Sequence, residues 1–125
     1  MENIFKNKII LVTGGCGSIG SQIVKQLLSY EPKSVRIFER SESAHFRLNQ
    51  EIKSDKIRNL VGDVCDAERV HYAMDGVDIV FHAAAMKHVP LCEYNPFEAV
   101  RTNILGTQNL IDAEQKHGVD RFISI

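Results

Sequence analysis

Residues 9–20, Ile-Ile-Leu-Val-Thr-Gly-Gly-Cys-Gly-Ser-Ile-Gly, constrain the fold of this chain more than any other stretch. The continuous apolar run that opens it is typical of a buried parallel strand. Gly14 allows a sharp turn at the end of that strand, and Gly17 allows the main chain to approach a pyrophosphate closely. Gly20 allows the following helix to pack on the strand, and the helix N-terminus offers N–H groups to an anion. We therefore predict a dinucleotide-binding turn here, with a tight turn that binds nothing as the alternative.

Apolar periodicity predicts that strands and helices alternate along the rest of the chain. Because the connections are short, we expect an α/β fold with a doubly wound parallel sheet in strand order 3-2-1-4-5. The expected helices cover residues 19–30, 41–53, 66–76 and 95–118, and the expected later strands cover residues 35–39, 57–62, 77–85 and 121–125.

The last expected helix carries two further predictions. An apolar face is expected from Phe97, Val100, Ile104 and Ile111. Gly106 lies inside the helix, where glycine costs about 1 kcal/mol relative to alanine, so close packing is expected at that position.

Composition excludes several classes of function. With 125 residues the chain is long enough for one domain, residues 1–125, and its net charge of -1 does not favour nucleic acid as a partner. The three cysteines lack Cys-x-x-Cys spacing, which favours a reducing compartment over a disulfide framework. Because no apolar run is long enough to span a bilayer, we expect a cytoplasmic chain without a membrane span.

Two neighbouring charged residues bear on which dinucleotide is bound. Glu39 ends the expected second strand, about 20 residues past the glycine turn, where an acidic side chain can accept hydrogen bonds from the adenosine ribose hydroxyls. This favours NAD, because a carboxylate repels the 2′-phosphate of NADP. Arg40 instead offers a partner to that phosphate. We predict NAD over NADP, and a solvated charge pair remains the alternative interpretation.

Histidine and cysteine raise two other hypotheses. His82, His88, Cys92 and Glu93 are possible metal ligands, but they lack the spacing of a structural zinc site, so no metal site is predicted. Cys16, beside a helix N-terminus, is either a redox-sensitive thiol or a small residue accommodated between glycines.

Three stretches resemble a known family. Thr-Gly-Gly-x-Gly-x-x-Gly at residues 13–20 resembles the extended short-chain dehydrogenase/reductases that act on nucleotide sugars. Residues 82–96, His-Ala-Ala-Ala-Met-Lys-His-Val-Pro-Leu-Cys-Glu-Tyr-Asn-Pro, and residues 98–110 are similar to the polysaccharide-biosynthesis (CapD-like) group. That group comprises UDP-N-acetylglucosamine 4,6-dehydratases and related UDP-sugar epimerases. The resemblance covers essentially the whole chain.

The resemblance implies a Rossmann fold and a reaction. In the family, hydride passes from C4 of the sugar to a bound nicotinamide cofactor, water is lost across C5 and C6, and hydride returns to C6. The acid and base residues of the family follow the fifth strand, so catalytic residues are expected downstream of Ile125 and none within residues 1–125. The chain is thus expected to be the N-terminal NAD(P)-binding portion of a longer enzyme, inactive alone, whose missing part binds the UDP group.

The resemblance also implies roles for individual residues. Asp63 is assigned to the adenine amine, although an aspartate at a strand end also caps turns. Lys87 is expected to meet the cofactor ribose or the sugar. His88 and Tyr94 either touch the substrate or belong to a loop packed against a neighbouring subunit. Asn103 is either a pocket residue or an ordinary polar helix residue. The complete set of expected cofactor-binding positions is Gly14, Gly17, Ser18, Ile19, Gly20, Glu39, Arg40, Asp63, Val64, Ala83, Ala84, Ala85, Lys87 and Asn103.

Two alternative functions stay open at the level of sequence. A UDP-sugar 4-epimerase uses the same cofactor and the same part of the chain. A non-catalytic nucleotide-binding module retains the fold without the chemistry. Exposed apolar sheet surface and a free sheet edge would favour a homo-oligomer.

Overall fold

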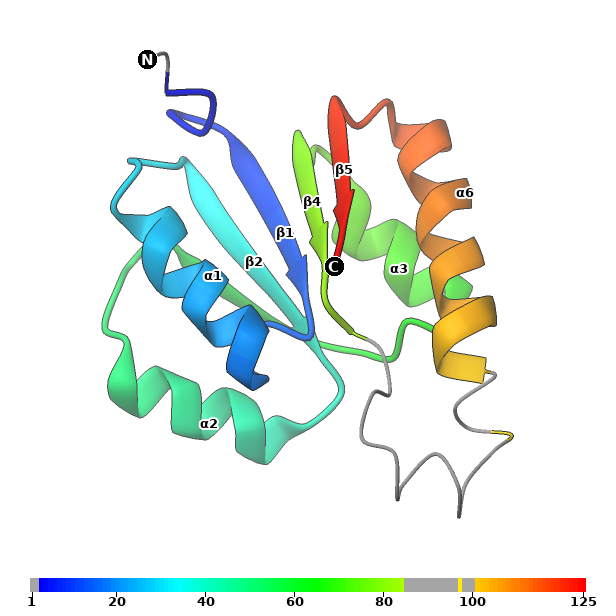
Figure 1. Cartoon of the computed structure of the whole chain (residues 1–125), viewed down its shortest axis with the longest axis horizontal. Helices are drawn as coiled ribbons and strands as arrows, with labels where there is room; N and C mark the ends of the chain where they lie inside the picture. The colour runs from blue at the N-terminus through cyan, green and yellow to red at the C-terminus, as the bar shows by residue number, and fades with distance from the viewer. Residues whose placement is uncertain (1–2, 85–96, 98–100) are drawn as a thin grey trace.

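The computed structural model of the chain describes residues 3–84, 97 and 101–125. Five parallel strands form one sheet in the order β3-β2-β1-β4-β5 (Figure 1), which confirms the predicted architecture. The strands are β1 (Ile9–Thr13), β2 (Ser34–Glu39), β3 (Ile57–Val61), β4 (Ile79–His82) and β5 (Arg121–Ser124). The helices are α1 (Ser18–Leu28), α2 (Glu42–Glu51), α3 (Ala67–Met74), the π-helical turn η1 (Arg101–Gly106) and α6 (Thr107–His117).

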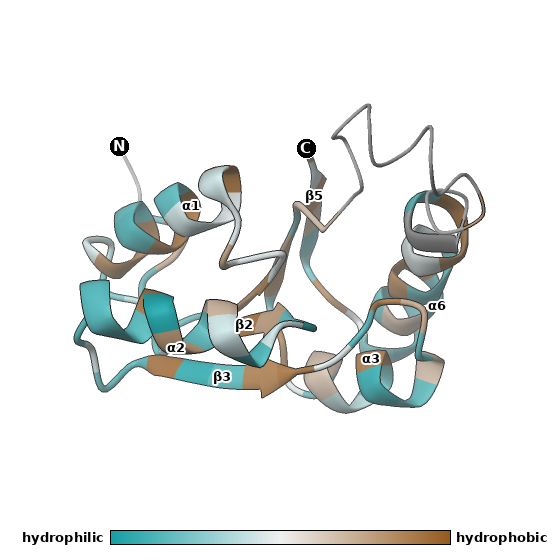
Figure 2. Cartoon of the chain, turned by 90° about the horizontal axis from the view of Figure 1, so that it is seen from below, coloured by the Kyte–Doolittle hydropathy of each residue, from teal (hydrophilic) through white to brown (hydrophobic). Residues whose placement is uncertain are grey.

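Helices cover both faces of the sheet. Figures 1 and 2 show α1 and α2 on one face and α3 and α6 on the other. Along β1 successive side chains point to opposite faces, so Ile10 and Val12 join the core beneath α1 while Leu11 joins the core beneath α3 and α6. β1 is therefore buried on both sides, as its continuous apolar sequence predicts.

Local signals explain most helix ends. The Ser41 hydroxyl accepts a hydrogen bond from the Ala44 N–H and begins α2, and the Asp66 carboxylate accepts one from the Arg69 N–H and begins α3. Gly118, in the left-handed conformation with φ 68°, ends α6.

Three elements are clearly shorter than predicted: α1, β4 and α2, which ends at Glu51 instead of residue 53. α1 ends at Leu28 instead of residue 30, because the next two N–H groups bond three residues back in a tighter turn. β4 spans Ile79–His82 instead of residues 77–85, because the Val77 N–H bonds to the Met74 carbonyl and prolongs the turn after α3.

The last strand ends one residue earlier than predicted. β5 ends at Ser124, whereas the predicted strand included Ile125. The Ile125 N–H still donates to the His82 carbonyl at 3.1 Å, but β4 itself ends at His82, which pairs with Ser124. Ile125 therefore has no strand residue opposite it in β4, and the ladder stops at the His82–Ser124 pair.

The predicted apolar face of the last helix is wrong at Phe97 and Ile104, whereas Ile111 is partly buried. Phe97 is 85% exposed and Ile104 is 61% exposed, whereas Leu110 and Ala113 are buried; Val100 lies outside the described residues. The π-helical turn η1 is wider than an α-helical turn, so the face defined before it does not continue into α6. Gly106, where η1 ends, packs as predicted, because a Cβ there would overlap the Val64 side chain.

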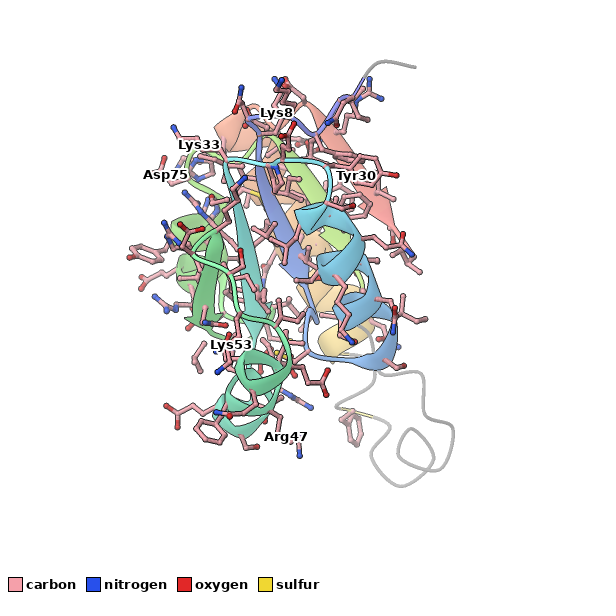
Figure 3. The ribbon with its side chains drawn as sticks, turned by 90° about the vertical axis from the view of Figure 1, so that its left-hand side faces the viewer. Lys8, Tyr30, Lys33, Arg47, Lys53 and Asp75 are labelled. Carbon is pink, nitrogen blue, oxygen red and sulfur yellow. The ribbon has the colours of Figure 1, made fainter. Side chains whose placement is uncertain are left out.

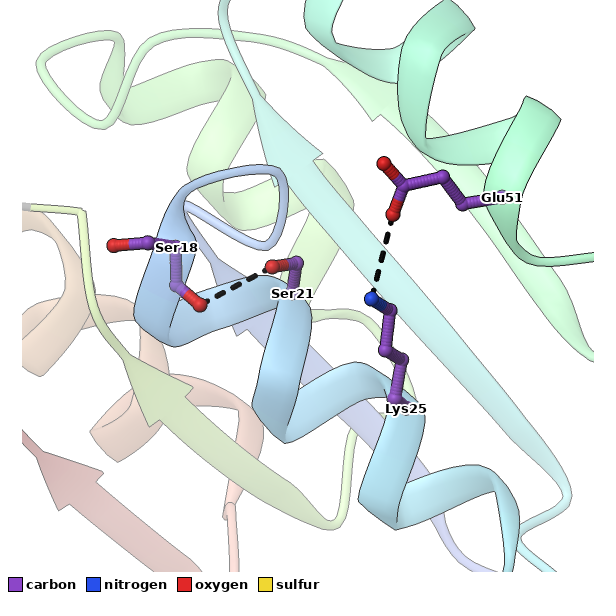
Figure 4. Close-up of polar contacts among 4 residues, drawn as sticks. All are labelled: Ser18, Ser21, Lys25 and Glu51. Atoms are coloured by element: carbon purple, nitrogen blue, oxygen red, sulfur yellow. Dashed lines mark hydrogen bonds and ion pairs between the residues drawn. The ribbon is translucent and has the colours of Figure 1, made fainter.

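Surface charge contributes little to holding the layers together. Among the described residues one ion pair forms, Lys25 of α1 with Glu51 of α2 at 3.3 Å (Figure 4), and both side chains are exposed. Such pairs are typically worth less than about 1 kcal/mol. In the described part of the chain, no helix is long and apolar enough to cross a membrane.

Candidate functional site

A cavity of about 230 Å³ lies at the carboxyl ends of the central strands, where open α/β sheets bind ligands. Residues from β2 and from the turns after β1, β3 and β4 line it. The lining residues are Gly14, Gly17, Phe38, Glu39, Arg40, Gly62, Asp63, Val64, Ala83 and Ala84. Most of these were predicted from the sequence, and Phe38 and Gly62 were not.

The glycine turn is pressed against the end of β4. Gly14 has φ 66°, and a Cβ there would lie 3.0 Å from the Ala84 backbone. A Cβ at Gly20 would overlap the Gly14 carbonyl. Two of the predicted glycine roles, a sharp turn at Gly14 and close helix packing at Gly20, are thus visible in the geometry.

The backbone N–H groups at the N-terminus of α1 are not capped by a side chain. Gly17 is its N-cap, so no side chain caps the helix, and the first turn contains no acidic residue. By contrast, α2 and α3 both have side-chain caps. The free N–H groups and the helix dipole leave this end suited to a phosphate group. Ser18 and Ile19 begin α1 beside the cavity without lining it, and both are exposed.

A buried hydrogen-bond network joins the ends of β1 and β4. The Thr13 Oγ1 accepts hydrogen bonds from the Ala83 N–H at 3.1 Å and the Ala84 N–H at 3.2 Å. Because these bonds occupy its acceptor positions, its own proton is donated to His82 Nδ1, 2.7 Å away. The His82 proton therefore resides on Nε2, which donates to Thr107 Oγ1 at 3.2 Å.

This network bears on the metal hypothesis. Both ring nitrogens of His82 are engaged by threonine hydroxyls. Within the described ranges no three potential metal ligands gather, and His88, Cys92 and Glu93 lie outside those ranges.

Glu39 and Arg40 both line the cavity, and they differ in how firmly they are held. Glu39 is half-buried at the end of β2, and its carbonyl accepts hydrogen bonds from the Gly62 N–H at 3.1 Å and His45 Nε2 at 3.0 Å. Arg40 is exposed at the start of the loop to α2. The backbone that carries the Glu39 carboxylate is therefore held more firmly than the backbone that carries the Arg40 side chain.

Asp63 has the turn-forming role that was the alternative to ligand binding. Its Oδ1 accepts a hydrogen bond from the Cys65 N–H at 2.9 Å. Its Oδ2 has no hydrogen-bond partner among the described residues, and the side chain lines the cavity. The turn thus orients the carboxylate and leaves one oxygen for a ligand.

Close approaches behind the cavity involve residues that sequence reasoning missed. A Cβ at Gly62 would lie 2.7 Å from the Phe38 ring and from the Arg69 side chain. Asn109 of α6 donates from Nδ2 to the Val64 carbonyl at 2.9 Å. An amide on the inward face of an otherwise amphipathic helix was the available signal for Asn109. No local pattern marks Gly62.

Other predicted positions lie elsewhere. Asn103 is exposed in η1 and does not line the cavity. Ala85, Lys87 and His88 lie outside the described residues. The catalytic residues were expected downstream of Ile125, so their placement stays a prediction. Ile125 itself follows β5 directly, at the same carboxyl edge of the sheet as Ala83 and the cavity.

Cys16 lies in the glycine turn. Partial burial raises the pKa of its thiol to about 11, and the Glu39 carboxylate adds to the rise while Arg47 opposes it. A reactive cysteine needs a lowered pKa, so this environment disfavours the redox hypothesis. Figure 3 shows Arg47 near the lower end of the view, far from Lys8, Lys33 and Asp75 at the opposite end.

Comparison with known proteins gives a family match and curated relatives. A family described as polysaccharide biosynthesis protein matches residues 10–125. An uncharacterized membrane protein of Methanocaldococcus jannaschii is 56% identical over all of this chain and 38% of its own length. An inverting UDP-N-acetylglucosamine 4,6-dehydratase of Campylobacter jejuni is 47% identical over 98% of this chain and 37% of its own. A UDP-glucose 4-epimerase of Rickettsia canadensis is 37% identical over 96% and 36%.

Solved structures show the same fold. Pen from Bacillus thuringiensis superposes with a TM-score of 0.93 and 50% identity, covering 97% of this chain and 37% of that protein. The dTDP-glucose 4,6-dehydratase DesIV from Streptomyces venezuelae, solved with NAD bound, has a TM-score of 0.83 and 31% identity over 91% and 38%. The chain therefore spans less than two fifths of the length of these proteins.

Proposed function

The chain belongs to the polysaccharide biosynthesis protein family, and we propose that it is the nicotinamide-dinucleotide-binding part of an enzyme that modifies nucleotide sugars. The observation that carries the proposal is the cavity at the carboxyl ends of the strands, which is lined by Gly17 at the uncapped N-terminus of α1 and by the acidic residues Glu39 and Asp63. The curated dehydratase and epimerase relatives and the NAD-bound neighbour support it.

The residues fit a dinucleotide in three parts. The N–H groups at the start of α1 receive the pyrophosphate, because Gly17 brings no side chain between the helix end and the cavity. Glu39 accepts hydrogen bonds from the adenosine ribose, and Asp63 Oδ2, which has no partner among the described residues, accepts one from the adenine amine. Ala83 and Ala84 leave room for the rest of the cofactor beside β4.

We favour NAD over NADP. Glu39 is half-buried with its carbonyl held by two hydrogen bonds, so its carboxylate stays close to the position of a 2′-phosphate and repels it. Arg40 is exposed and must reorder to pair with a phosphate, at a cost in side-chain entropy.

For the complete enzyme we propose a UDP-N-acetylglucosamine 4,6-dehydratase, because the dehydratase of Campylobacter jejuni shares more of its sequence with this chain than the epimerase of Rickettsia canadensis does. The bound dinucleotide supplies reversible hydride transfer at the sugar. Residues 1–125 hold the cofactor, and the acid and base groups belong to a portion downstream of Ile125. A UDP-sugar 4-epimerase is the second candidate, supported by the same epimerase relative.

Calorimetric titration with NAD, and separately with NADP, tests the cofactor proposal. We expect saturable binding with NAD preferred, weakened about fivefold by Glu39→Gln, because a charge-assisted hydrogen bond is replaced by a neutral one that is weaker by about 1 kcal/mol. Lys33→Ala is the control, since Lys33 lies at the opposite end of the sheet (Figure 3) and its loss should leave affinity unchanged. Absence of binding to both dinucleotides would contradict the proposal and favour a non-binding turn.

The reaction is tested on a longer protein that contains this chain. Incubation with UDP-N-acetylglucosamine should yield a 4-keto-6-deoxy sugar nucleotide, detected by a mass loss of one water. An unchanged mass with inverted C4 stereochemistry would instead identify the epimerase. No turnover despite NAD binding would favour the non-catalytic module.

A further inference from the structure

His45 is a buried polar residue of α2, a helix whose other polar residues are mostly exposed. It is 5% exposed, and only Ala44 and Leu48 accompany it on the buried side of α2. Because α2 buries few apolar side chains, its position over the sheet depends strongly on directional contacts. One of the two hydrogen-bond partners of the His45 ring is Glu39, which lines the candidate cofactor site.

The first contact ends on the backbone of Glu39. His45 Nε2 lies 3.0 Å from the Glu39 carbonyl oxygen, and because a carbonyl only accepts, Nε2 carries the proton and donates. The Gly62 N–H donates to the same oxygen at 3.1 Å. Both acceptor positions of this carbonyl are thus filled, one from α2 and one from the turn after β3.

The second contact ends on β3. His45 Nδ1 lies 3.0 Å from Asn59 Oδ1, and Asn59 Nδ2 lies 3.3 Å from Asn49 Oδ1 on the next turn of α2. A neutral ring satisfies both of its contacts when the Asn59 amide is turned over, which exchanges its oxygen and nitrogen. The Asn49 amide must turn over with it, so that an Asn49 N–H faces the Asn59 oxygen. The imidazole of α2 therefore bridges β2 and β3.

These contacts connect the backbone at Glu39 with the backbone next to Asp63, the two residues that bring carboxylates to the site. Glu39 is held at its own carbonyl, and Asp63 directly follows Gly62, whose N–H shares that carbonyl. We propose that His45 is a positioning residue that fixes Glu39 and Asp63 relative to each other, and thereby sets the preference for an adenosine ribose without a 2′-phosphate. This inference rests on the proposed dinucleotide function.

The physical argument concerns the direction of one side chain. Fixing the Glu39 carbonyl fixes the plane of the peptide bond that follows and limits the directions open to the Glu39 carboxylate. Without the His45 donor, the Gly62 bond alone remains, and the carboxylate can move away from the 2′ position. The affinity for NAD then falls because the hydrogen bonds to the ribose weaken. The 2′-phosphate of NADP, in contrast, is no longer repelled by a nearby Glu39 carboxylate.

The test compares NAD and NADP affinities across three variants. In His45→Leu, which fills the space without a donor, we expect NAD affinity to fall about tenfold while NADP affinity stays within about twofold. In His45→Gln, whose amide nitrogen can still donate to the Glu39 carbonyl, the NAD preference should be largely retained. Leu48→Ala is the matched control: it removes a buried side chain of the same helix without touching the network.

A purely structural role predicts a different pattern. General destabilisation lowers both affinities by the same factor, so a preserved NAD/NADP ratio in His45→Leu, or an equal change of the ratio in Leu48→Ala, would overturn the assignment of His45. Failure of the unmutated chain to bind either dinucleotide would instead overturn the proposed function itself. The two failures are therefore distinguishable in one set of titrations.

Discussion

Thr13 and His82, 69 positions apart in the sequence, share a hydrogen bond of 2.7 Å across the junction of β1 and β4. The threonine hydroxyl also receives the Ala83 and Ala84 N–H groups. One buried hydroxyl oxygen thus holds the backbone that directly follows β4 against the start of the glycine turn. Gly14, Ala83 and Ala84 at this junction line the cavity.

Replacing Thr13 by valine should destabilise the chain substantially. The shape is nearly unchanged, but His82 Nδ1 loses its donor and the Ala84 N–H loses its hydroxyl acceptor, whereas the Ala83 N–H keeps the Thr13 carbonyl at 3.1 Å. Leaving such groups unsatisfied costs about 1–3 kcal/mol, measurable by urea unfolding. Thr13→Ser keeps the hydroxyl and should recover most of the loss. Equal stability of the valine variant and the unmutated chain would contradict the network.

Gly14→Ala and Gly118→Ala form a matched pair. Both glycines have positive φ, 66° and 68°, so alanine pays a similar conformational cost of about 1–2 kcal/mol at each. A Cβ at Gly118 meets nothing within 4 Å, whereas a Cβ at Gly14 meets the Ala84 backbone at 3.0 Å. We expect Gly118→Ala to leave NAD affinity unchanged and Gly14→Ala to abolish it. Equal effects on titration would mean that the close approach is unimportant.

Gly106→Ala should test the contact between η1 and Val64, which lines the cavity. Helix propensity alone would favour alanine by about 1 kcal/mol, but the new methyl group overlaps Val64, and overpacking typically costs about 1–3 kcal/mol. We expect net destabilisation in thermal unfolding. The double variant Gly106→Ala with Val64→Ala should be less destabilised than the sum of the single changes, and strict additivity would argue against direct contact.

Cys16 should alkylate slowly near neutral pH. Its pKa of about 11 exceeds the usual 9.0, so the thiolate is scarce below pH 9 and the rate should rise with pH toward 11. Iodoacetamide labelling in a Cys65→Ser, Cys92→Ser background isolates this thiol. Glu39→Gln should lower the pKa and speed labelling at pH 9, because it removes the nearby negative charge. A fully reactive Cys16 at pH 7 would restore the redox hypothesis.

The sequence alone determined the layered fold, and it predicted most of the residues that line the candidate cavity. Strand order followed from alternating apolar patterns with short connections. Glycine spacing and the acidic strand end indicated Gly14 and Glu39, the family resemblance indicated Asp63, and the capping residue Asp66 indicated the start of α3. These signals are local: each depends on neighbours within one or two turns of the chain.

The tertiary structure alone decided which side chains hold that site in place. His82 looked like a possible metal ligand until the fold brought Thr13 and Thr107 to its two nitrogens, and His45 carried no motif until β2 and β3 met α2. The π-helical turn η1 shifted the buried face of the last helix in a way that α-helical spacing does not encode. Hydrogen bonds between residues far apart in sequence depend on the packed positions of whole elements, and those positions exist only once the chain has folded.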